Sequence, residues 1–469
     1  MSKTVPSIVH IGLGAFHRAH QAVYLQSYFD RTGDDSWHIC AANIRSNQAI
    51  VDALNEAGHC YPVVAYESGD VATVTDVRVL SETLFAGVDK SVLLQRLIAP
   101  ATRLVTLTVT EKGYGLLSNG EALNHDDPAI AADWQSLDSP KSVPGLLLAA
   151  IRARTAEGLV PFTVLSCDNL PHNGRRVQAA VRLLAERHCP ELVENIQAMS
   201  FPSSMVDRIV PAVTDEAIAK SARWVGQQDP LVVVTEQFSQ WVVEDNFTNG
   251  RPDWEVDGVT MVDDVEPYET MKLRLLNGAH SLLAYAGLLL GHSTVDQAVS
   301  DPALRAVVLA YFDEARLTVK VAVDLDAYCS ALLKRFANDS LHHQLAQIAM
   351  DGSQKVPQRW LRGVIDRRQQ GFDSPIAALA LACWMAHLRG AGIQGASYPI
   401  NDPLADNLVQ CVDDEPSAYV AKLMAVDGLV PAACSEDNVF IVQLVASLKR
   451  ISDCTTAAQL SCALSDVTP

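Results

Sequence analysis

The sequence contains no CxxC pair, no HExxH motif and no cysteine–histidine grouping with the spacing of zinc ligands. Its ten cysteines are scattered along 469 residues. In a chain of this length, scattered cysteines are typical of reduced core thiols in a cytoplasmic protein. We therefore expect a cytoplasmic protein whose chemistry uses no metal ion.

Segments that would direct the chain to a membrane or to a nucleic acid are also missing. The N-terminus runs into an apolar strand without the architecture of a signal peptide. The longest apolar runs, near residues 281–290 and 376–386, are too short to cross a bilayer. The formal net charge of −19, from 36 basic and 55 acidic residues, disfavours nucleic acids and anionic membranes as partners.

The length and the residue pattern predict two domains, because 469 residues exceed the usual size of one. The first half alternates short β-branched runs with helical patterns, which is typical of a parallel sheet with crossover helices. We expect a helix at 17–32 and strands at 7–11, 37–42, 103–110, 162–166 and 231–235. These features predict an α/β fold that begins with a Rossmann-like dinucleotide-binding domain over residues 1–265.

After about residue 265, long segments rich in alanine and leucine replace this alternation. They predict helices at 268–290, 298–315, 326–336, 340–350, 373–389, 415–425 and 436–451. A cluster of Asp263, Asp264 and Pro267 marks the boundary. We therefore expect residues 266–469 to form an all-helical substrate-binding and catalytic domain.

A glycine turn, with Gly12 and Gly14, stands between the first expected strand and the first expected helix. Two glycines allow the tight turn and the close backbone approach that a pyrophosphate needs, and the helix N-terminus supplies donors. The third glycine of the usual pattern is replaced by His17, so a plain turn is the alternative. The second strand ends without a carboxylate for the ribose, and Arg45 could accept a 2′-phosphate or stack on adenine. The choice between NAD and NADP therefore stays open.

Four reactive side chains share one arc of the first helix of the second half. At 100° per residue, with Lys272 at zero, Glu269 lies at about 60°, His280 at about 80° and Asn277 at about 140°. The rest of this helix is rich in leucine, so we expect it to be mostly buried. Burial disfavours the charged form of a lysine and lowers its pKa toward the range of a general base. The alternative is a core helix in which Lys272 and Arg274 reach solvent.

Six motifs occur in order over nearly the whole chain: GLGAFHRAHQ at 12–21, TVTEKGY at 108–114, SCDNLPHNG at 166–174, FPSSMVDR at 201–208, QFSQWVVE at 237–244 and KLRLLNGAH at 272–280. Together they resemble the polyol-specific long-chain dehydrogenase family, which includes mannitol 2-dehydrogenase, D-arabinitol 4-dehydrogenase and the fructuronate reductases. Any one motif could occur by chance, whereas all six in family order are specific.

The resemblance implies a role for each matching residue. Lys272 matches the catalytic lysine that takes the alcohol proton, and Asn169 and Asn277 match two amides that hold the reacting oxygen. His280 matches a substrate-contacting histidine, and Glu269 matches a carboxylate that connects the lysine to solvent. The implied substrate-binding residues are Asp207 and Lys355. The implied cofactor-binding residues are Ile11, Gly12, Gly14, Phe16, Asn43, Arg45, Thr110 and Glu111.

Two of these assignments have structural alternatives. Glu269 could be a helix-start carboxylate at a favourable dipole position, and Asp207 could simply pair with Arg208. The chain also departs from the family pattern at two positions: Ser203 stands where the family usually has asparagine, and Gln347 stands where many members have a substrate-binding arginine.

Compared with the family pattern, Gln347 removes one cation from the expected substrate-binding wall, and Arg335 or Arg362 could replace it. For this reason the resemblance does not select one substrate. It implies a metal-independent oxidoreductase that interconverts a secondary alcohol of a sugar alcohol and a ketose with NAD, NADP not being excluded. The alternative within the family is a D-mannonate/fructuronate oxidoreductase.

Two readings lie outside this family. Tyr268 and Lys272 have the Tyr-x-x-x-Lys spacing of short-chain dehydrogenases, but those chains are about half as long and place the pair inside a Rossmann domain. The non-enzymatic alternative is a nucleotide-binding redox sensor. The resemblance also implies a monomer or a weak homodimer.

Overall fold

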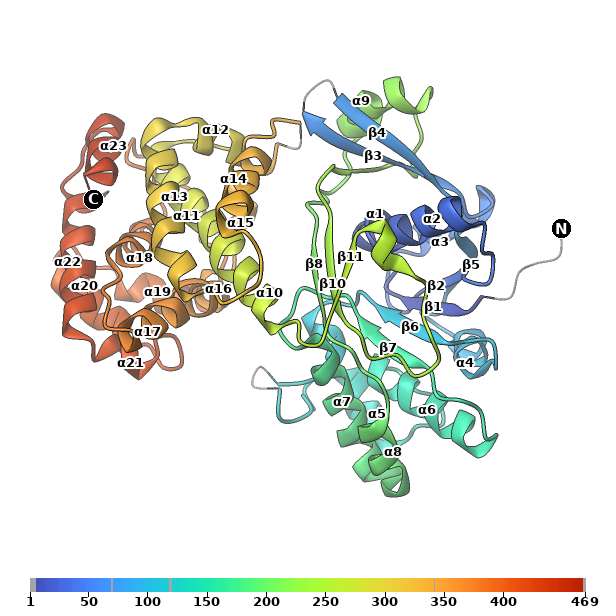
Figure 1. The fold of residues 1–469 in the computed structure, drawn as a ribbon. Helices are drawn as coiled ribbons and strands as arrows, with labels where there is room; N and C mark the ends of the chain where they lie inside the picture. The colour runs from blue at the N-terminus through green and yellow to red at the C-terminus, as the bar shows by residue number, and fades with distance from the viewer. Residues whose placement is uncertain (1–5, 69–70, 118–119, 341, 467–469) are drawn as a thin grey trace. The chain divides into compact units, whose positions relative to one another are not determined.

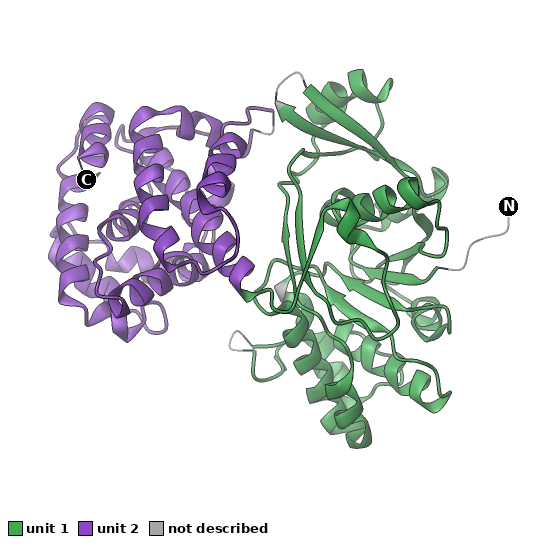
Figure 2. Ribbon diagram, in the orientation of Figure 1, with its two compact units in different colours: residues 1–266 green, residues 267–469 purple. Residues whose placement is uncertain are grey.

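The computed structural model describes residues 6–68, 71–117, 120–340 and 342–466, and the chain divides into two compact units. Unit 1 covers Met1–Glu266 and unit 2 covers Pro267–Pro469 (Figure 2). Unit 1 contains a parallel sheet with helices, and unit 2 is built from helices (Figure 1). The fold class predicted from the sequence is confirmed.

The central sheet of unit 1 has five parallel strands in the order β5-β2-β1-β6-β7. Its register places Ile11 opposite Ala42 and Leu107, and Leu107 opposite Ser166, so the carboxyl ends of four strands lie at one edge. Because the chain order reverses between β1 and β6, this edge is where such sheets bind ligands. The strands are β1 (Ile8–Ile11), β2 (Ile39–Asn43), β5 (Leu80–Phe85), β6 (Leu104–Leu107) and β7 (Thr163–Ser166).

Helices cover both faces of this sheet, so β1, β2, β6 and β7 are buried along their whole length, whereas the edge strand β5 is partly half-buried. One core joins strand residues such as Val105 and Val164 to Leu147 and Leu184, and the other joins Ala41 to residues of α2. The helices of unit 1 are α1 (Ala15–Ala19), α2 (Gln21–Thr32), α3 (Gln48–Glu56), α4 (Ser91–Ile98), η1 (Glu111–Tyr114), α5 (Pro128–Gln135), α6 (Val143–Ala156), α7 (Asn173–His188), η2 (Pro190–Leu192), α8 (Val193–Ala198), α9 (Asp215–Val225) and η3 (Trp254–Asp257).

Two smaller sheets complete unit 1, in the orders β4-β3-β9 and β11-β10-β8. Their strands are β3 (Tyr61–Ser68), β4 (Val71–Val77), β8 (Ser204–Asp207), β9 (Val233–Glu236), β10 (Gln240–Glu244) and β11 (Val259–Val262). The strand expected at 231–235 therefore exists as β9, but it pairs with β3 and lies outside the central sheet. The expected helix at 17–32 begins earlier, at Ala15, and is interrupted at His20.

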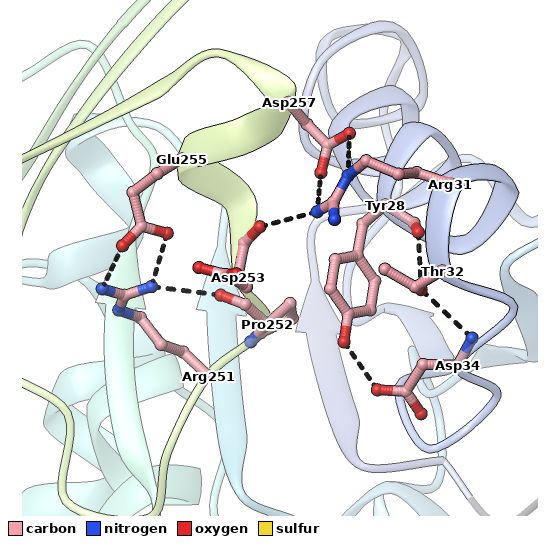
Figure 3. A network of polar contacts seen from close by, with 9 residues as sticks. All are labelled: Tyr28, Arg31, Thr32, Asp34, Arg251, Pro252, Asp253, Glu255 and Asp257. Carbon is pink, nitrogen blue, oxygen red and sulfur yellow. Dashed lines mark hydrogen bonds and ion pairs between the residues drawn. The ribbon is translucent and has the colours of Figure 1, made fainter.

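A network of arginines and carboxylates fastens η3 to α2 (Figure 3). Arg31 on α2 pairs with Asp257 at 2.9 Å and donates to the backbone carbonyl of Asp253 at 2.9 Å. Arg251 binds both oxygens of Glu255, at 2.7 and 2.8 Å. Bidentate geometry makes these stronger than ordinary surface pairs. The network therefore holds η3, which precedes β11, against α2.

Unit 2 is helical over its described residues, apart from isolated bridges such as Ala391 with Ser397. Its elements are α10 (Glu266–Met271), η4 (Lys272–Asn277), α11 (Gly278–Leu290), α12 (Val295–Ser300), α13 (Pro302–Ala315), η5 (Arg316–Thr318), α14 (Leu325–Phe336), α15 (Leu345–Ile348), α16 (Gly352–Val356), η6 (Pro357–Leu361), α17 (Arg362–Gln369), α18 (Pro375–His387), α19 (Ala405–Cys411), α20 (Pro416–Met424), α21 (Ala432–Ser435), α22 (Asn438–Ser452) and α23 (Ala457–Ser465). Two of them, η4 and η6, are π-helical.

The expectation that no apolar segment could cross a bilayer needs one correction. Because α10, η4 and α11 are continuous, Glu266–Leu290 forms one helix of 25 residues, and among the described residues it is long and apolar enough to span. However, 83% of its most apolar window is buried, as in the core helix of a globular protein. Length and composition alone are therefore weak evidence for a membrane span.

The cysteines are all free. Seven are buried, as expected for core thiols, whereas Cys60 and Cys462 are exposed and Cys454 is half-buried.

Candidate active site

The glycine turn after β1 is built so that no side chain fits at its first residue. Gly12 has φ +108°, and a Cβ there would lie 2.0 Å from the carbonyl oxygen of Thr108. Its N–H donates to the carbonyl of Ala42 at 2.8 Å, and the N–H of Gly14 donates to the carbonyl of Gly12 at 2.7 Å. A Cβ on Gly14 would meet nothing closer than 3.8 Å, so the space beside it is open. The turn offers a bare backbone surface of the kind that a pyrophosphate approaches.

Two buried, stacked histidines contact this turn on its core side. His10 Nε2 lies 3.1 Å from the carbonyl oxygen of Gly12, and its Nδ1 lies 2.8 Å from Thr106 Oγ1. Because a carbonyl can only accept, Nε2 carries the proton and Nδ1 accepts from the threonine. Burial lowers the pKa of His10 to about 3, so the ring is neutral. The ring of His17 stacks on it at 3.3 Å, and burial lowers the pKa of His17 well below its usual value.

His17, which replaces the third glycine, is therefore a fully buried residue of the core side of the turn. The helix that follows the turn, α1, has only five residues before the break at His20. Its macrodipole is correspondingly smaller than the sequence suggested. Phe16 is half-buried and stacks on His20 with ring centroids 5.0 Å apart.

The end of β2 carries the expected Asn43 and Arg45. The buried Asn43 amide donates to the carbonyl of Leu13 at 3.3 Å, which links β2 to the glycine turn. Arg45 is about half exposed and pairs with Asp127 at 3.4 Å. Asn43 thus acts on the shape of the turn, while the Arg45 guanidinium remains accessible to solvent.

The ends of β6 and β7 bring a second group of expected residues together. Thr110 has φ +66°, which is rare for a β-branched residue. Its N–H donates to the Asp168 carboxylate at 2.8 Å, and Asn169 follows directly and is exposed within unit 1. The side chain of Glu111 lies outside the part of the chain that the structure describes.

Asp207 is the last residue of β8 and is buried, with Gln240 as its register partner on β10. The alternative in which it pairs with Arg208 is not what the geometry favours. The Arg208 guanidinium donates to the backbone carbonyls of Ala19 and Glu236.

In unit 2, Lys272 and Asn277 are the first and last residues of the π-helical segment η4. The arc calculated for an ideal α-helix is therefore wrong in detail. Hydrogen bonds from i to i+5 widen the turn and advance the chain by about 80° per residue. With Lys272 at zero, Asn277 then lies at about 40°, His280 at about −20° and Glu269 at about 60°. The four side chains occupy an arc of about 80° in place of about 140°, so the π-segment gathers them more closely.

Side chains from elsewhere in unit 2 bind the carbonyls of this widened turn. The Tyr311 hydroxyl donates to the carbonyl of Arg274 at 2.7 Å, and Trp360 Nε1 donates to that of Gly278 at 3.2 Å. Arg359 Nη1 donates to the carbonyl of Asn277 at 3.2 Å. A π-segment disturbs the normal ladder of i to i+4 bonds, and these donors satisfy carbonyl oxygens along it.

Lys272 is 8% exposed within unit 2, and Arg274 is also buried, with an ion pair to Asp366 and a bond to the carbonyl of Thr318 at 2.8 Å. The alternative in which both cations reach solvent from a core helix is thus excluded for Arg274. Glu269 and Asn277 are half-buried.

His280 is a buried imidazole with an available nitrogen. Its ring stacks on Phe336 at 5.3 Å and meets His343 edge-on at 5.0 Å. Among the described residues, its Nε2 has no hydrogen-bond partner. Burial lowers its pKa well below the usual value, and the charges of His343, Arg359, Arg335 and Lys355 act in the same direction. A neutral ring with an orphaned nitrogen suits a substrate hydroxyl.

The cations proposed for substrate binding differ in their surroundings. Lys355 donates to the backbone carbonyls of Ile348 and Met350 at 3.2 and 2.5 Å. Arg335 is buried next to Phe336, whereas Arg362 and Gln347 are exposed within unit 2. Of the two arginines that could replace the missing cation, Arg335 is therefore the one near His280.

The expected residues thus form two groups, one in each unit. Unit 1 gathers Ile11, Gly12, Gly14, Asn43, Thr110 and Asn169 at the carboxyl edge of the sheet, and Asp207 ends β8 of another sheet; unit 2 gathers Glu269, Lys272, Asn277 and His280 on one helix. Sequence reasoning missed Asp168 and Arg359. Asp168 could have been found, because it belongs to the SCDNLPHNG motif and comes two residues after the end of β7. Nothing in the sequence around Arg359 indicates its contact with Asn277.

Across residues 6–68, 71–117, 120–340 and 342–466, no group of three or more histidine, cysteine or acidic side chains is arranged to hold a metal ion.

Comparison with known proteins gives matches along the chain. Family models match as the mannitol dehydrogenase Rossmann domain over residues 6–256 and the mannitol dehydrogenase C-terminal domain over residues 264–452. The uncharacterized oxidoreductase YeiQ of Escherichia coli (strain K12) is 43% identical over 409 residues, 86% of this chain and 83% of that protein. The D-mannonate oxidoreductase of the same strain is 40% identical over 410 residues, 86% of this chain and 84% of that protein. The solved structure of Pseudomonas fluorescens mannitol 2-dehydrogenase, a ternary complex with NAD and D-mannitol, matches with a TM-score of 0.86 and 35% identity, covering 97% of this chain and 94% of that one.

Proposed function

Because the chain belongs to the mannitol dehydrogenase family, as its motifs predicted, we propose that it interconverts a secondary alcohol of a sugar alcohol and the corresponding ketose, with NAD as cofactor. The observation that carries this proposal is the π-helical turn, which places the buried Lys272 on one arc with Asn277 and His280. A lysine, an amide and a neutral imidazole are the groups needed to take a proton from an alcohol and to hold its oxygen.

In this proposal each side chain acts on one atom of the substrate. The Lys272 amine accepts the hydroxyl proton, and the amides of Asn169 and Asn277 donate to the oxygen as its charge develops. His280 Nε2 bonds a neighbouring hydroxyl, and the half-buried Glu269 passes the lysine proton to solvent. Bound NAD would supply the hydride acceptor.

The residues at the carboxyl edge of the sheet fit NAD. The open space beside Gly14 and the backbone at Gly12, where no Cβ is tolerated, leave room for a pyrophosphate. Asn43 holds the turn through Leu13. Arg45 would lie near the adenosine end, and since its guanidinium is accessible, NADP is not excluded.

The test of this function is replacement of the proposed base. Lys272→Ala should lower turnover about 10²–10⁴-fold with polyols, the usual contribution of general-base catalysis. Lys449→Ala, which removes an exposed lysine from α22 of the same unit, is the control and should keep wild-type turnover. Near-normal turnover in Lys272→Ala would refute the assignment. A wild-type protein that binds NADH but oxidises or reduces no polyol, ketose or uronate would favour the redox sensor.

One observation favours a second candidate substrate class, the aldonates. Burial lowers the pKa of His280 most, and His343 comes next. The other groups that lower it are three cations, Arg359, Arg335 and Lys355. Positive surroundings favour a substrate that carries a carboxylate. One relative, 40% identical, is a D-mannonate oxidoreductase.

Comparison of D-mannonate with D-mannitol decides between these classes. If the carboxylate is recognised, Arg335→Gln should lower kcat/KM for the aldonate about 10–100-fold, as for the loss of one hydrogen bond to a charged group, and should change kcat/KM for mannitol much less. Arg362→Gln is the matched control, because this arginine is exposed. Equal losses for both substrates would argue against a carboxylate at Arg335.

A monomer or weak homodimer and a cytoplasmic location remain parts of this proposal. Sedimentation velocity over a range of concentrations tests the first, and cell fractionation tests the second.

A further inference from the structure

The carboxylate of Asp168 joins the backbone of the loop after β6 to the loop after β7. It accepts hydrogen bonds from the N–H groups of Val109 at 3.1 Å and Thr110 at 2.8 Å. It also accepts one from the Tyr114 hydroxyl at 2.8 Å, and that hydroxyl contacts Ser166 at the end of β7. Asp168 is 8% exposed, so these bonds replace the water that would otherwise solvate its charge.

One of the donors to Asp168 belongs to a strained residue. Thr110 has φ +66° and ψ 167°, a region that is almost reserved for glycine. Such a conformation persists only where the surroundings fix it. The bond from the Thr110 N–H holds the peptide unit just before this residue, and the bond from the Val109 N–H holds the one before that. On the other side, the Thr110 carbonyl accepts from the Gly113 N–H at 2.9 Å, so the peptide units on both sides of Thr110 are held.

The backbone of Asp168 is tied in turn to a third element. The amide nitrogen of Asn173 donates to the carbonyl of Asp168 at 2.9 Å and to that of Ser204 at 2.8 Å. The Ser204 N–H donates back to the Asn173 side chain at 3.0 Å. Ser204 begins β8, the strand that ends with Asp207. The network therefore connects three segments that carry expected site residues.

We propose that Asp168 is a positioning residue, which sets the conformation of the cofactor loop at Thr110 and thereby its placement relative to the Asn169 amide. This inference rests on the proposed function for the roles of Thr110 and Asn169. In this proposal the Asp168 side chain acts through the peptide groups that it binds.

The chain offers a matched control in Asp133. Its buried carboxylate also accepts two backbone N–H bonds, from Lys141 at 2.7 Å and Ser142 at 2.8 Å, and one hydroxyl bond, from Ser142 at 2.5 Å. It lies on α5, and its partners Lys141 and Ser142 belong to the segment just before α6. Asp168→Asn and Asp133→Asn therefore remove the same kind of charge and the same number of charged bonds from the same unit.

The experiment measures NADH affinity by fluorescence titration, turnover, thermal unfolding and hydrogen exchange for both variants. We expect Asp168→Asn to weaken NADH binding and to lower kcat, each about 10–100-fold, and to speed exchange of the Val109 and Thr110 amides. Asp133→Asn should lower the unfolding temperature similarly but keep NADH affinity and kcat within about twofold of wild type.

A second variant separates positioning from plain loss of stability. Thr110→Gly removes the strain, so in the Asp168→Asn background it should restore part of the NADH affinity without restoring the unfolding temperature. Unchanged NADH affinity and amide exchange in Asp168→Asn, with the same loss of stability as Asp133→Asn, would overturn the inference. A wild-type protein inactive with every polyol and uronate would instead refute the proposed function, while the exchange comparison would still decide the role of Asp168.

Discussion

Replacement of Gly278 by alanine tests the π-helical turn directly. A Cβ at this position would lie 2.0 Å from the Tyr311 hydroxyl and 2.8 Å from its Cζ. Tyr311 is 3% exposed and its hydroxyl donates to the carbonyl of Arg274, so it cannot move aside without losing that bond. We therefore expect Gly278→Ala to push Tyr311 away and to disturb the backbone at Asn277.

The magnitude follows from three effects. Overpacking a close-packed core costs about 1–3 kcal/mol. Leaving the Arg274 carbonyl unpaired costs about 1–3 kcal/mol more. The higher helix propensity of alanine raises the unfolding free energy by about 1 kcal/mol relative to glycine. The net loss of unfolding free energy is about 3 kcal/mol, which lowers the melting temperature of a unit of this size by about 6–12 °C.

The assay is thermal unfolding followed by circular dichroism, together with turnover at a temperature where the variant is folded. Gly363→Ala is the matched control: this glycine lies in α17 of the same unit, and its Cβ would meet nothing within 4 Å. That variant should be as stable as wild type or more stable by about 0.5–1 kcal/mol. If Gly278→Ala behaved like Gly363→Ala, or kept full turnover while losing stability, the reasoning about the π-turn would be wrong.

Three further predictions concern other parts of the molecule. Asn169→Ala and Asn277→Ala should each lower kcat about 10²–10³-fold in steady-state assays, whereas a change in KM alone would indicate ground-state binding. The pKa of His10 is about 3 in the fold and about 6.5 in the unfolded chain, so only the unfolded chain binds a proton at this residue between these values. The contribution of His10 to the unfolding free energy is therefore full above about pH 6.5 and falls by about 1.4 kcal/mol per pH unit as the pH drops toward 3. In urea titrations at several pH values, the unfolding free energy of His10→Gln should change with pH by about 1.4 kcal/mol per unit less than that of wild type over this range. Of the ten thiols, Cys60 and Cys462 should react rapidly with a thiol reagent in the native protein, and fast labelling of buried cysteines would contradict the packing.

The carboxyl-edge residues could be predicted from the sequence because their signals are local. A strand followed by Gly12 and Gly14 predicts the first turn, and short motifs that resemble the family assigned Thr110 and Asn169, which lie after β6 and β7 in the structure. The strand pairing could not be predicted in the same way. The run that forms β3 contains Pro62, which argues against a strand, and β9 has the composition of a central strand although it pairs with β3.

The helix that carries Lys355 and Arg359 was also missed, for a physical reason. Pro357 lies in its interior, where a proline lacks an N–H and clashes with the preceding turn of an α-helix. In the structure the helix is π-helical at this point, over η6. The wider π-turn moves the i−4 carbonyl away from the proline ring and so avoids the clash. A pattern search that assumes 3.6 residues per turn ends the helix at the proline, so Lys355 was named through the family resemblance and Arg359, which follows the proline, was missed.

The π-segment η6 supplies donors to the end of the π-segment η4, and this contact explains why the site geometry cannot be obtained from the KLRLLNGAH motif alone. The segment η6 presents Arg359 and Trp360 to η4, where they donate to the carbonyls of Asn277 and Gly278. These donors stabilise the end of the widened turn, and the Tyr311 hydroxyl donates to the carbonyl of Arg274 inside it; each bond contributes about 0.5–1.5 kcal/mol, and about 1.5–3 kcal/mol for the charged Arg359. An α-helical turn would return Asn277 to about 140° from Lys272 and move the amide away from the amine. The proline-bearing helix, which contains no residue of the KLRLLNGAH motif, therefore helps to hold the wider turn that spaces the groups of this motif.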